Sequence, residues 1–193
     1  MRIILASKSP RRKEILENLG LEFEIIVADA DESCDVKDPA ELVITIAERK
    51  GRAVLDNLGE TERNDTLLIA CDTLVYACGE FLGKPRDDGD AKRMLKMLSD
   101  GSHEVVSGLY LYYGGKEIRR AESTKVFFDK MTDGDIRRYI ESGEPRDKAG
   151  AYAIQGKASA YIKGIEGDYF NVVGLPAHLL MKTVKEELGI ELK

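Results

Sequence analysis

Short apolar runs alternate along this chain with stretches in which apolar residues recur at helical spacing. Each run is bounded by glycines, charged residues or turn-forming residues, a pattern typical of buried β-strands. A pair of glycines, Gly114-Gly115, separates two of the longest runs and predicts a hairpin. We therefore expect strands at residues 2–6, 23–27, 66–76, 81–82, 103–113 and 117–128.

Five segments with helical periodicity begin at a capping residue or a proline. The clearest is 87–98, because its apolar residues fall on one face. We expect helices at 10–19, 39–58, 87–98, 132–143 and 176–189, and further strands within the glycine- and tyrosine-rich stretch 149–173. Strand–helix units that alternate with hairpins predict an α/β protein with a twisted mixed sheet and a cleft, rather than a symmetric barrel.

The composition is that of a soluble globular protein, since 43% of the 193 residues are hydrophobic and 33% are charged. This length suits one domain, or two lobes that share one core. No apolar run is long enough to span a bilayer, and Met1–Ala6 lacks the features of a secretory signal. The three cysteines cannot all pair and show no metal-binding spacing, which argues against a disulfide framework or a structural zinc and favours the cytoplasm.

The net charge of −6 argues against a general nucleic-acid surface, which needs an excess of lysine and arginine. The basic residues nonetheless gather in short segments rich in glycine, proline and serine. Local basic pockets on an acidic protein suit a small anion better than a polymer. Tryptophan is absent and aromatic residues amount to 7%, which disfavours the stacking platforms of single-strand nucleic-acid binders.

The first candidate anion site follows the first strand. Ser9 and Pro10 predict a helix N-terminus, and Arg11 and Arg12 then fall in the first turn of that helix. Cations there oppose the helix dipole, whereas a bound phosphate would meet backbone N–H groups, hydroxyls and guanidinium groups together. The alternative, in which both arginines point to solvent, carries equal weight on this segment alone.

Asp72 interrupts the apolar strand 66–76 on the face that its apolar neighbours share. A buried carboxylate without a partner is costly, so Asp72 must meet a cation, hydrogen-bond donors or a metal. A structural salt bridge is the alternative to a catalytic role. Thr73 points to the other face of a regular strand, or joins Asp72 if the strand ends there.

Three further charged residues have settings that suit a nucleotide. Lys84 is fixed between Gly83 and Pro85 while its ammonium can reach a phosphate. Lys50 lies among small residues of a predicted helix, and Glu32 lies in an acidic loop, where a carboxylate helps to hold Mg²⁺ or Mn²⁺. For each of them the ordinary alternative is a solvated surface side chain.

Lys148 and Gln155 lie among small residues near the C-terminal third of the chain. Lys148 either reaches a phosphate or pairs with its neighbour Asp147. The Gln155 amide both donates and accepts hydrogen bonds, so it can read the edge of a base, with turn stabilisation as the alternative.

Seven motifs in series resemble those of the Maf family and span nearly the whole chain in the family's order. Each motif is weak alone, and together they make the resemblance specific. They are Leu-Ala-Ser-x-Ser-Pro-Arg-Arg at 5–12, Lys50 in its helix, Asp72-Thr73, Gly83-Lys84-Pro85, Asp147-Lys148-Ala149-Gly150-Ala151-Tyr152, Ile154-Gln155-Gly156, and Gly167-Asp168-Tyr169 with Val173-Gly174-Leu175-Pro176. The chain departs from the family pattern at Cys71, where alanine is common.

The resemblance implies a single Maf-like domain over 1–193, similar in fold to inosine triphosphate pyrophosphatases, with two lobes around a deep central cleft and a homodimeric assembly. It implies a hydrolase that cleaves nucleoside triphosphates between the α and β phosphates, with house-cleaning of modified nucleotides and a link to septum formation and cell-division arrest. Within the family, Arg12, Thr73 and Gln155 match the version that acts on dTTP and UTP.

The residues and the resemblance together assign roles. Asp72 is the expected general base and, with Glu32, a ligand of the divalent metal, and Lys50 and Lys84 complete the catalytic set. The expected substrate-binding residues are Ser7, Arg11, Arg12, Thr73, Lys148 and Gln155. Two rival classes stay open: a nucleotide-sensing regulator of septum formation without turnover, and a single-strand nucleic-acid module. The carboxylate of Asp72 weighs against the first, and the net charge weighs against the second.

Overall fold

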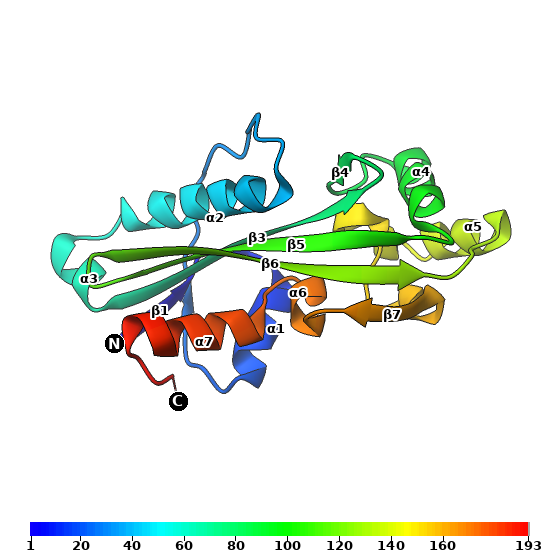
Figure 1. Cartoon of the computed structure of the whole chain (residues 1–193). Helices are drawn as coiled ribbons and strands as arrows, with labels where there is room; N and C mark the ends of the chain where they lie inside the picture. The colour runs from blue at the N-terminus through cyan, green and yellow to red at the C-terminus, as the bar shows by residue number, and fades with distance from the viewer. Residues whose placement is uncertain (193) are drawn as a thin grey trace. The chain divides into compact units, whose positions relative to one another are not determined.

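The computed structural model describes residues 1–192 and contains a mixed β-sheet flanked by helices (Figure 1). The strands are β1 (Arg2–Leu5), β2 (Glu24–Ile25), β3 (Thr66–Ala77), β4 (Glu80–Leu82), β5 (Ser102–Tyr113), β6 (Lys116–Phe128) and β7 (Ile162–Glu166). The α-helices are α1 (Pro10–Asn18), α2 (Pro39–Leu55), α3 (Glu60–Asn64), α4 (Asp88–Leu98), α5 (Asp133–Glu141), α6 (Tyr169–Val173) and α7 (Ala177–Leu188). Three short 3₁₀ helices are η1 (Glu144–Asp147), η2 (Ala149–Ala151) and η3 (Lys157–Tyr161). The α/β class with a mixed sheet is as predicted.

Within residues 1–192 the strands follow the order β2-β1-β3-β5-β6-β7, with β4 beside β3. Strand β1 pairs in parallel with β2 and with β3, and Leu5 is level with Ile69. Strand β4 returns antiparallel to β3, and β7 runs antiparallel to β6. Strand β1, which forms both of these parallel pairs, directly precedes the first predicted candidate site.

Three predicted elements differ from the structure. The strand expected at 23–27 is reduced to two residues in β2. The second helix ends at Leu55, and Gly59, which was expected only to stop it, instead begins α3, with the Glu62 side chain accepting a hydrogen bond from the Gly59 N–H at 3.0 Å. Among the described residues the stretch 149–173 holds one strand, β7, rather than several, because Gly150 and Ala151 adopt positive φ angles that interrupt extended chain.

Helix caps explain several of the helix boundaries. Asp38 caps α2 by accepting a hydrogen bond from the Glu41 N–H at 2.9 Å, and Thr132 caps α5 in a reciprocal arrangement with Asp135. Ser9 occupies the N-cap position of α1, but its side chain makes no capping bond. Pro10 in the first turn therefore defines the start of α1.

The residues divide into two compact units, to which β3, β5 and β6 each contribute in part. Unit 1 comprises Met1–Asp72, Ser107–Glu122 and the chain from Gly174 on. In this unit α2 covers one face of the sheet, and α1 and α7 lie on the other face (Figure 1). No helix among residues 1–192 has both the length and the apolar character needed to cross a bilayer.

Helix α2 lies unusually close to β5, because two glycines face the contact. A Cβ on Gly108 would lie 2.3 Å from the backbone of Val43, and a Cβ on Gly51 would lie 2.3 Å from the Tyr110 ring. Side chains at these positions would push the helix outward. The close packing fixes α2, and with it Lys50, relative to the sheet.

Unit 2 comprises Thr73–Val106 and Ser123–Val173. Its core gathers side chains from α4, α5 and the sheet around Leu95, Phe128 and Tyr152, all of them buried. The rings of Phe128 and Tyr152 meet edge to face at 5.0 Å, and His103 packs against both. This core supports the segment that carries Lys148 and Gln155.

Candidate active site

Two of the predicted site segments belong to neighbouring parallel strands in unit 1, one directly after β1 and the other within β3. Since Leu5 is level with Ile69, the loop after β1 begins beside the middle of β3. Ser7, in that loop, is only 8% exposed. Its Oγ accepts hydrogen bonds from the Ser9 N–H at 3.2 Å and from Nη1 of Arg12 at 3.0 Å. Ser7 and Arg12 are therefore in direct contact.

The Gly174 carbonyl joins Arg12 to strand β3. Nε of Arg12 donates to this oxygen at 2.8 Å, and Sγ of Cys71 lies 3.5 Å from the same oxygen. Gly174 has a φ of 131°, a backbone conformation that favours glycine. Arg12 and Cys71, the residue before Asp72, therefore share one backbone acceptor.

Lys50 connects the two carboxylates that were predicted to hold a metal. Its Nζ lies 2.7 Å from Oδ1 of Asp72 and 3.0 Å from Oε2 of Glu32. The Asp72 side chain is 17% exposed and that of Glu32 is 59% exposed, so the pair with Asp72 is the better shielded one. Asp72 has the cationic partner that its place in an apolar strand demanded.

The acidic loop that carries Glu32 is tied to α2 by a second cation. Nη1 of Arg49 donates to the backbone carbonyls of Asp31 and Ser33 at 3.0 and 2.6 Å. The Ser33 hydroxyl and N–H both donate to the Asp31 carboxylate, which lowers the pKa of Asp31. Adjacent residues of α2, Arg49 and Lys50, therefore hold both the backbone and the side chain of this loop.

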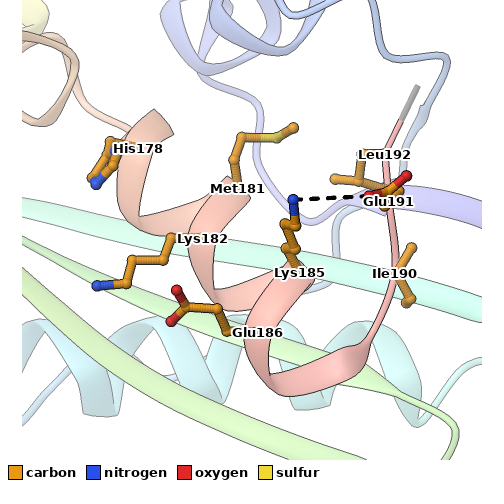
Figure 2. Close-up of a pocket in the computed structure, with 8 residues that line it drawn as sticks. All are labelled: His178, Met181, Lys182, Lys185, Glu186, Ile190, Glu191 and Leu192. Atoms are coloured by element: carbon orange, nitrogen blue, oxygen red, sulfur yellow. Dashed lines mark ion pairs between the residues drawn. The ribbon is translucent and has the colours of Figure 1, made fainter.

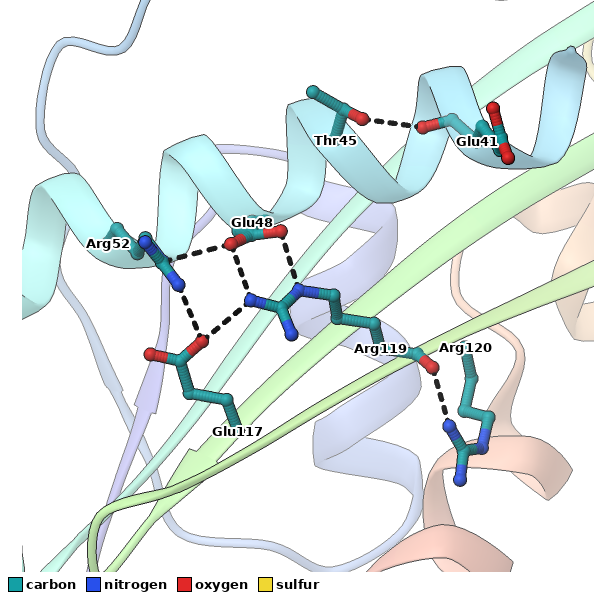
Figure 3. Close-up of polar contacts among 7 residues, drawn as sticks. All are labelled: Glu41, Thr45, Glu48, Arg52, Glu117, Arg119 and Arg120. Carbon is teal, nitrogen blue, oxygen red and sulfur yellow. Dashed lines mark hydrogen bonds and ion pairs between the residues drawn. The ribbon is translucent and has the colours of Figure 1, made fainter.

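A network of alternating charges anchors α2 to strand β6 on its other side (Figure 3). Arg119 makes two hydrogen bonds of 2.6 Å to Glu48, and its Nη2 also lies 2.8 Å from Glu117. Arg52 bridges the same two glutamates, at 3.0 Å from Glu48 and 2.8 Å from Glu117. Lys50 sits between Glu48 and Arg52 in the sequence, so this network restrains the helix from which Lys50 projects.

Unit 2 brings together the two motifs that carry lysines. The Gly150 N–H donates to the Gly83 carbonyl at 3.1 Å, which places the Lys148 segment beside Lys84 in the fold. A Cβ on Gly150 would lie 2.9 Å from Val75, so this segment also packs directly on β3 beyond Thr73.

The two lysines differ in their surroundings. Lys84 is exposed and forms no ion pair with the residues that the structure describes. Lys148 pairs with the carboxylate of Asp147, which was one of its two expected alternatives. Gln155 is exposed and lies in a tight turn, closed by a hydrogen bond of 3.1 Å from the Gly156 N–H to the Ala153 carbonyl.

The donor set near Lys50 fits a hard divalent cation that is completed by a ligand. Glu32 and Asp72 present carboxylate oxygens to one cationic atom, and Mg²⁺ or Mn²⁺ is commonly bound by one or two carboxylates together with substrate phosphates and water. Among residues 1–192 no group of three or more His, Cys, Asp or Glu side chains is arranged as a complete metal site. Protein atoms alone would therefore leave several coordination positions to the phosphates.

A separate pocket of about 620 Å³ lies along α7, between this helix and the segment that follows it (Figure 2). Its lining mixes apolar and charged side chains of α7 and of the segment after it, including Met181, Lys185 and Ile190. None of the predicted site residues lines this pocket. It does not belong to the candidate site.

The structure thus assembles the predicted residues into groups within each unit. In unit 1, Ser7 contacts Arg12, and Lys50 contacts both Asp72 and Glu32. In unit 2, the Lys84 and Lys148 segments are joined. The convergence of both groups on one ligand, and the cleft, stay predictions.

Two contributors have no role in the sequence-based interpretation. Gly174 appeared only as part of a motif, and Arg49 did not appear at all. Both act through contacts with residues far away in the sequence, Arg49 with 31 and 33 and Gly174 with Arg12, 162 positions away. The glycine before Leu-Pro was the one available signal, because a conformation reserved for glycine often marks a close approach.

Comparison with known proteins matches the sequence model of the family described as Maf-like protein to residues 2–187. A dTTP/UTP pyrophosphatase of Chromobacterium violaceum is 47% identical over 184 residues, which cover 92% of this chain and 90% of that protein. A dTTP/UTP pyrophosphatase of Caldanaerobacter subterraneus subsp. tengcongensis is 43% identical over 194 residues, covering 99% and 91%. One of Thermococcus gammatolerans is 43% identical over 189 residues, covering 98% and 97%.

Proposed function

This chain belongs to the Maf family, and we propose that it is a metal-dependent nucleoside triphosphate pyrophosphatase that acts on dTTP and UTP. In this reaction water adds across the α–β phosphoanhydride, and the products are the nucleoside monophosphate and pyrophosphate. The observation that carries the proposal is the contact of Lys50 with Asp72 and Glu32 in unit 1, the unit that also holds the Ser7–Arg12 contact. The activity of three relatives with near full-length similarity supports it.

Charge neutralisation is the first task that the proposal assigns. A nucleoside triphosphate carries about four negative charges, so positioning and electrostatic stabilisation must supply most of the rate. In unit 1, hydrogen bonds to Ser7 and Gly174 orient the Arg12 guanidinium. The Lys50 ammonium is held by the carboxylates of Glu32 and Asp72. The proposed triphosphate ligands are Ser7, Arg11, Arg12, Lys50, Lys84 and Lys148.

Asp72 is the proposed general base. Lys50 engages its Oδ1, which keeps the carboxylate oriented and leaves Oδ2 to accept the proton of the attacking water. Asp72 and Glu32 would also hold the divalent ion, which when bound neutralises phosphate charge and lowers the pKa of a coordinated water. Glu32 reaches this position because Arg49 fixes the backbone of its loop.

Base selection is assigned to Gln155, with Thr73 and Arg12. The Gln155 amide offers a donor and an acceptor, which complement the O4 and N3–H of thymine or uracil. A purine would present a larger base with a different edge. The resemblance to the family supports the remaining parts of the proposal, which are a cytoplasmic homodimer, the removal of modified nucleotides and a role in cell-division arrest.

The test is a panel of nucleoside triphosphates with the purified chain, in which monophosphate, pyrophosphate and orthophosphate are quantified separately. We expect equal amounts of monophosphate and pyrophosphate, the highest kcat/KM for dTTP and UTP, and loss of activity in EDTA that Mg²⁺ or Mn²⁺ restores. Orthophosphate as the only product would contradict cleavage at the α–β bridge. Nucleotide binding without any turnover would favour the sensor instead.

A further inference from the structure

The turn that presents Gln155 is held at both ends by two side chains from outside it. The Ala153 N–H, before Gln155, donates to Oη of Tyr139 at 3.2 Å. The Lys157 N–H, after Gln155, donates to Oε2 of Glu144 at 3.1 Å. Both contacts lie within unit 2.

The two holding side chains are also bonded to each other. Oη of Tyr139 donates to Oε1 of Glu144 at 2.8 Å. Tyr139 projects from α5 and is 3% exposed, and burial, together with this hydrogen bond, raises its pKa so that the hydroxyl keeps its proton. The Tyr139 hydroxyl therefore donates to Glu144 while it accepts from Ala153, which links both ends of the turn through one connected pair.

Gly156 shows how closely the carboxylate packs on the turn. A Cβ at this position would lie 2.1 Å from Oε1 of Glu144 and 2.4 Å from its Cδ. The backbone φ of Gly156 is −107°, which other residues adopt readily, so a side chain here would clash with the Glu144 carboxylate and would displace it from the turn. The glycine after Gln155 thus leaves room for the Glu144 carboxylate.

We propose that Tyr139 and Glu144 are positioning residues that hold the Gln155 amide in register for base recognition. This inference rests on the proposed function, in which Gln155 reads the base. Gln155 itself is exposed, so its aim depends on the backbone that carries it. A displacement of about 1 Å is enough to weaken a directional contact of this kind.

A purely structural role for the pair makes a different prediction. In that case, loss of the Tyr139 hydroxyl would lower the stability of unit 2 and leave base preference unchanged. A positioning role predicts that base preference changes while the rate of the chemical step is retained. The two roles therefore separate in kinetics.

The experiment compares Tyr139→Phe with wild type, because phenylalanine keeps the buried ring and removes only the hydroxyl. For this variant we expect the kcat/KM ratio of dTTP over dGTP to fall roughly 10-fold, through a higher KM for dTTP, with kcat within about twofold. Hydrogen exchange at the Ala153 and Lys157 amides should accelerate by about 10-fold. Glu144→Gln should act in the same direction, because one amide oxygen cannot replace both carboxylate acceptors.

The matched control is Tyr161→Phe. Tyr161 donates to Oδ1 of Asp135 at 3.1 Å, near the start of the same helix α5, so the variant loses an equivalent hydroxyl–carboxylate bond that involves neither Tyr139 nor Glu144. Base preference and the exchange of the two amides should stay at their wild-type values in this variant.

Two further outcomes are distinguishable. If Gln155→Ala relaxes the preference for dTTP but Tyr139→Phe and Glu144→Gln do not, the positioning role is wrong while the proposed function stands. If wild type hydrolyses no nucleotide, the proposed function fails and base recognition fails with it. If hydrogen exchange at the Ala153 and Lys157 amides is unchanged in Tyr139→Phe, the proposal that Tyr139 holds this turn is wrong, whatever the activity.

Discussion

At the scale of single residues, Arg12 is oriented before any ligand binds. Its Nε and Nη1 donate in two different directions, to the Gly174 carbonyl at 2.8 Å and to the Ser7 hydroxyl at 3.0 Å. A planar guanidinium can satisfy both acceptors at once, because its N–H groups form a rigid fork. A lysine ammonium at the end of a flexible chain has no fixed fork of this kind.

We therefore predict that Arg12→Lys weakens substrate binding although the charge is conserved. The KM for dTTP should rise about 10-fold, with a smaller change in kcat, in steady-state pyrophosphate-release assays. The control is Lys13→Arg, which makes the reverse exchange at the next position, where the side chain is 51% exposed. Equal KM values for Arg12→Lys and wild type would show that substrate binding does not depend on the guanidinium geometry.

His103 carries the clearest link between one residue and pH. It is 3% exposed, its Nε2 lies 2.7 Å from the Tyr152 hydroxyl, and burial lowers its pKa from 6.5 to about 4. The folded state thus disfavours the imidazolium, whereas the unfolded chain binds the proton below pH 6.5. The free energy of unfolding should therefore fall as pH falls from 6.5 to about 4, by on the order of 3 kcal/mol from this residue.

The measurement is urea unfolding of wild type and His103→Gln between pH 7.5 and 4. Carboxylates titrate in both proteins, so the difference between the two curves isolates the histidine. The stability advantage of wild type over the variant should shrink as the pH falls through that window. His178→Gln, which removes the exposed imidazole on α7, is the control, and a pH-independent difference for His103→Gln would contradict the prediction.

At the scale of elements, α2 links the packing of unit 1 to the proposed chemistry. The helix carries Lys50, lies against β5 at Gly108, and is fixed to β6 by the network of Glu48 with Arg119. Surface ion pairs contribute little singly, so the close backbone packing is the stronger restraint. A substitution at the Gly108–Val43 contact should therefore displace Lys50.

Gly108→Ala tests this coupling. Its Cβ would lie 2.3 Å from the backbone of Val43, so α2 must move, and the free energy of unfolding should fall by about 1–3 kcal/mol. The kcat on dTTP should fall as well, because Lys50 moves with the helix. Gly101→Ala is the control, because its Cβ would make an ordinary contact of 3.6 Å with the Leu98 carbonyl. A wild-type kcat in Gly108→Ala would contradict the coupling between this packing contact and Lys50.

Local sequence patterns predict most of the secondary structure, but not all of it. Most helices and strands follow from periodicity and caps, as with Asp38 at α2 and Thr132 at α5. The stretch 149–173 does not, because its conformation comes from close contacts of glycines with distant residues, such as Gly150 with Val75 and Gly156 with Glu144. Such contacts leave no periodic signal in the sequence.

At the scale of the whole molecule, an acidic chain of net charge −6 carries four of its five proposed cationic ligands in partly buried places, whereas Lys84 is exposed. The sequence identified Arg12 and Asp72 because each violates a local rule, a cation at a helix N-terminus and a carboxylate in an apolar strand. It could not identify Arg49 or the Gly174 carbonyl, because their contacts depend on the tertiary fold. Local violations thus point to candidate residues, whereas the contacts that support those residues become visible only in the folded structure.

In the proposed reaction, Asp72, oriented by Lys50, accepts the proton of the water that attacks a nucleoside triphosphate. The most direct measurement is the rate of pyrophosphate release from dTTP by wild type and by Asp72→Asn, with Asp56→Asn as an exposed-carboxylate control and nucleotide binding measured in parallel. We expect kcat to fall by at least about 100-fold in Asp72→Asn, with much of the affinity and the fold retained. A kcat equal to that of wild type would contradict it.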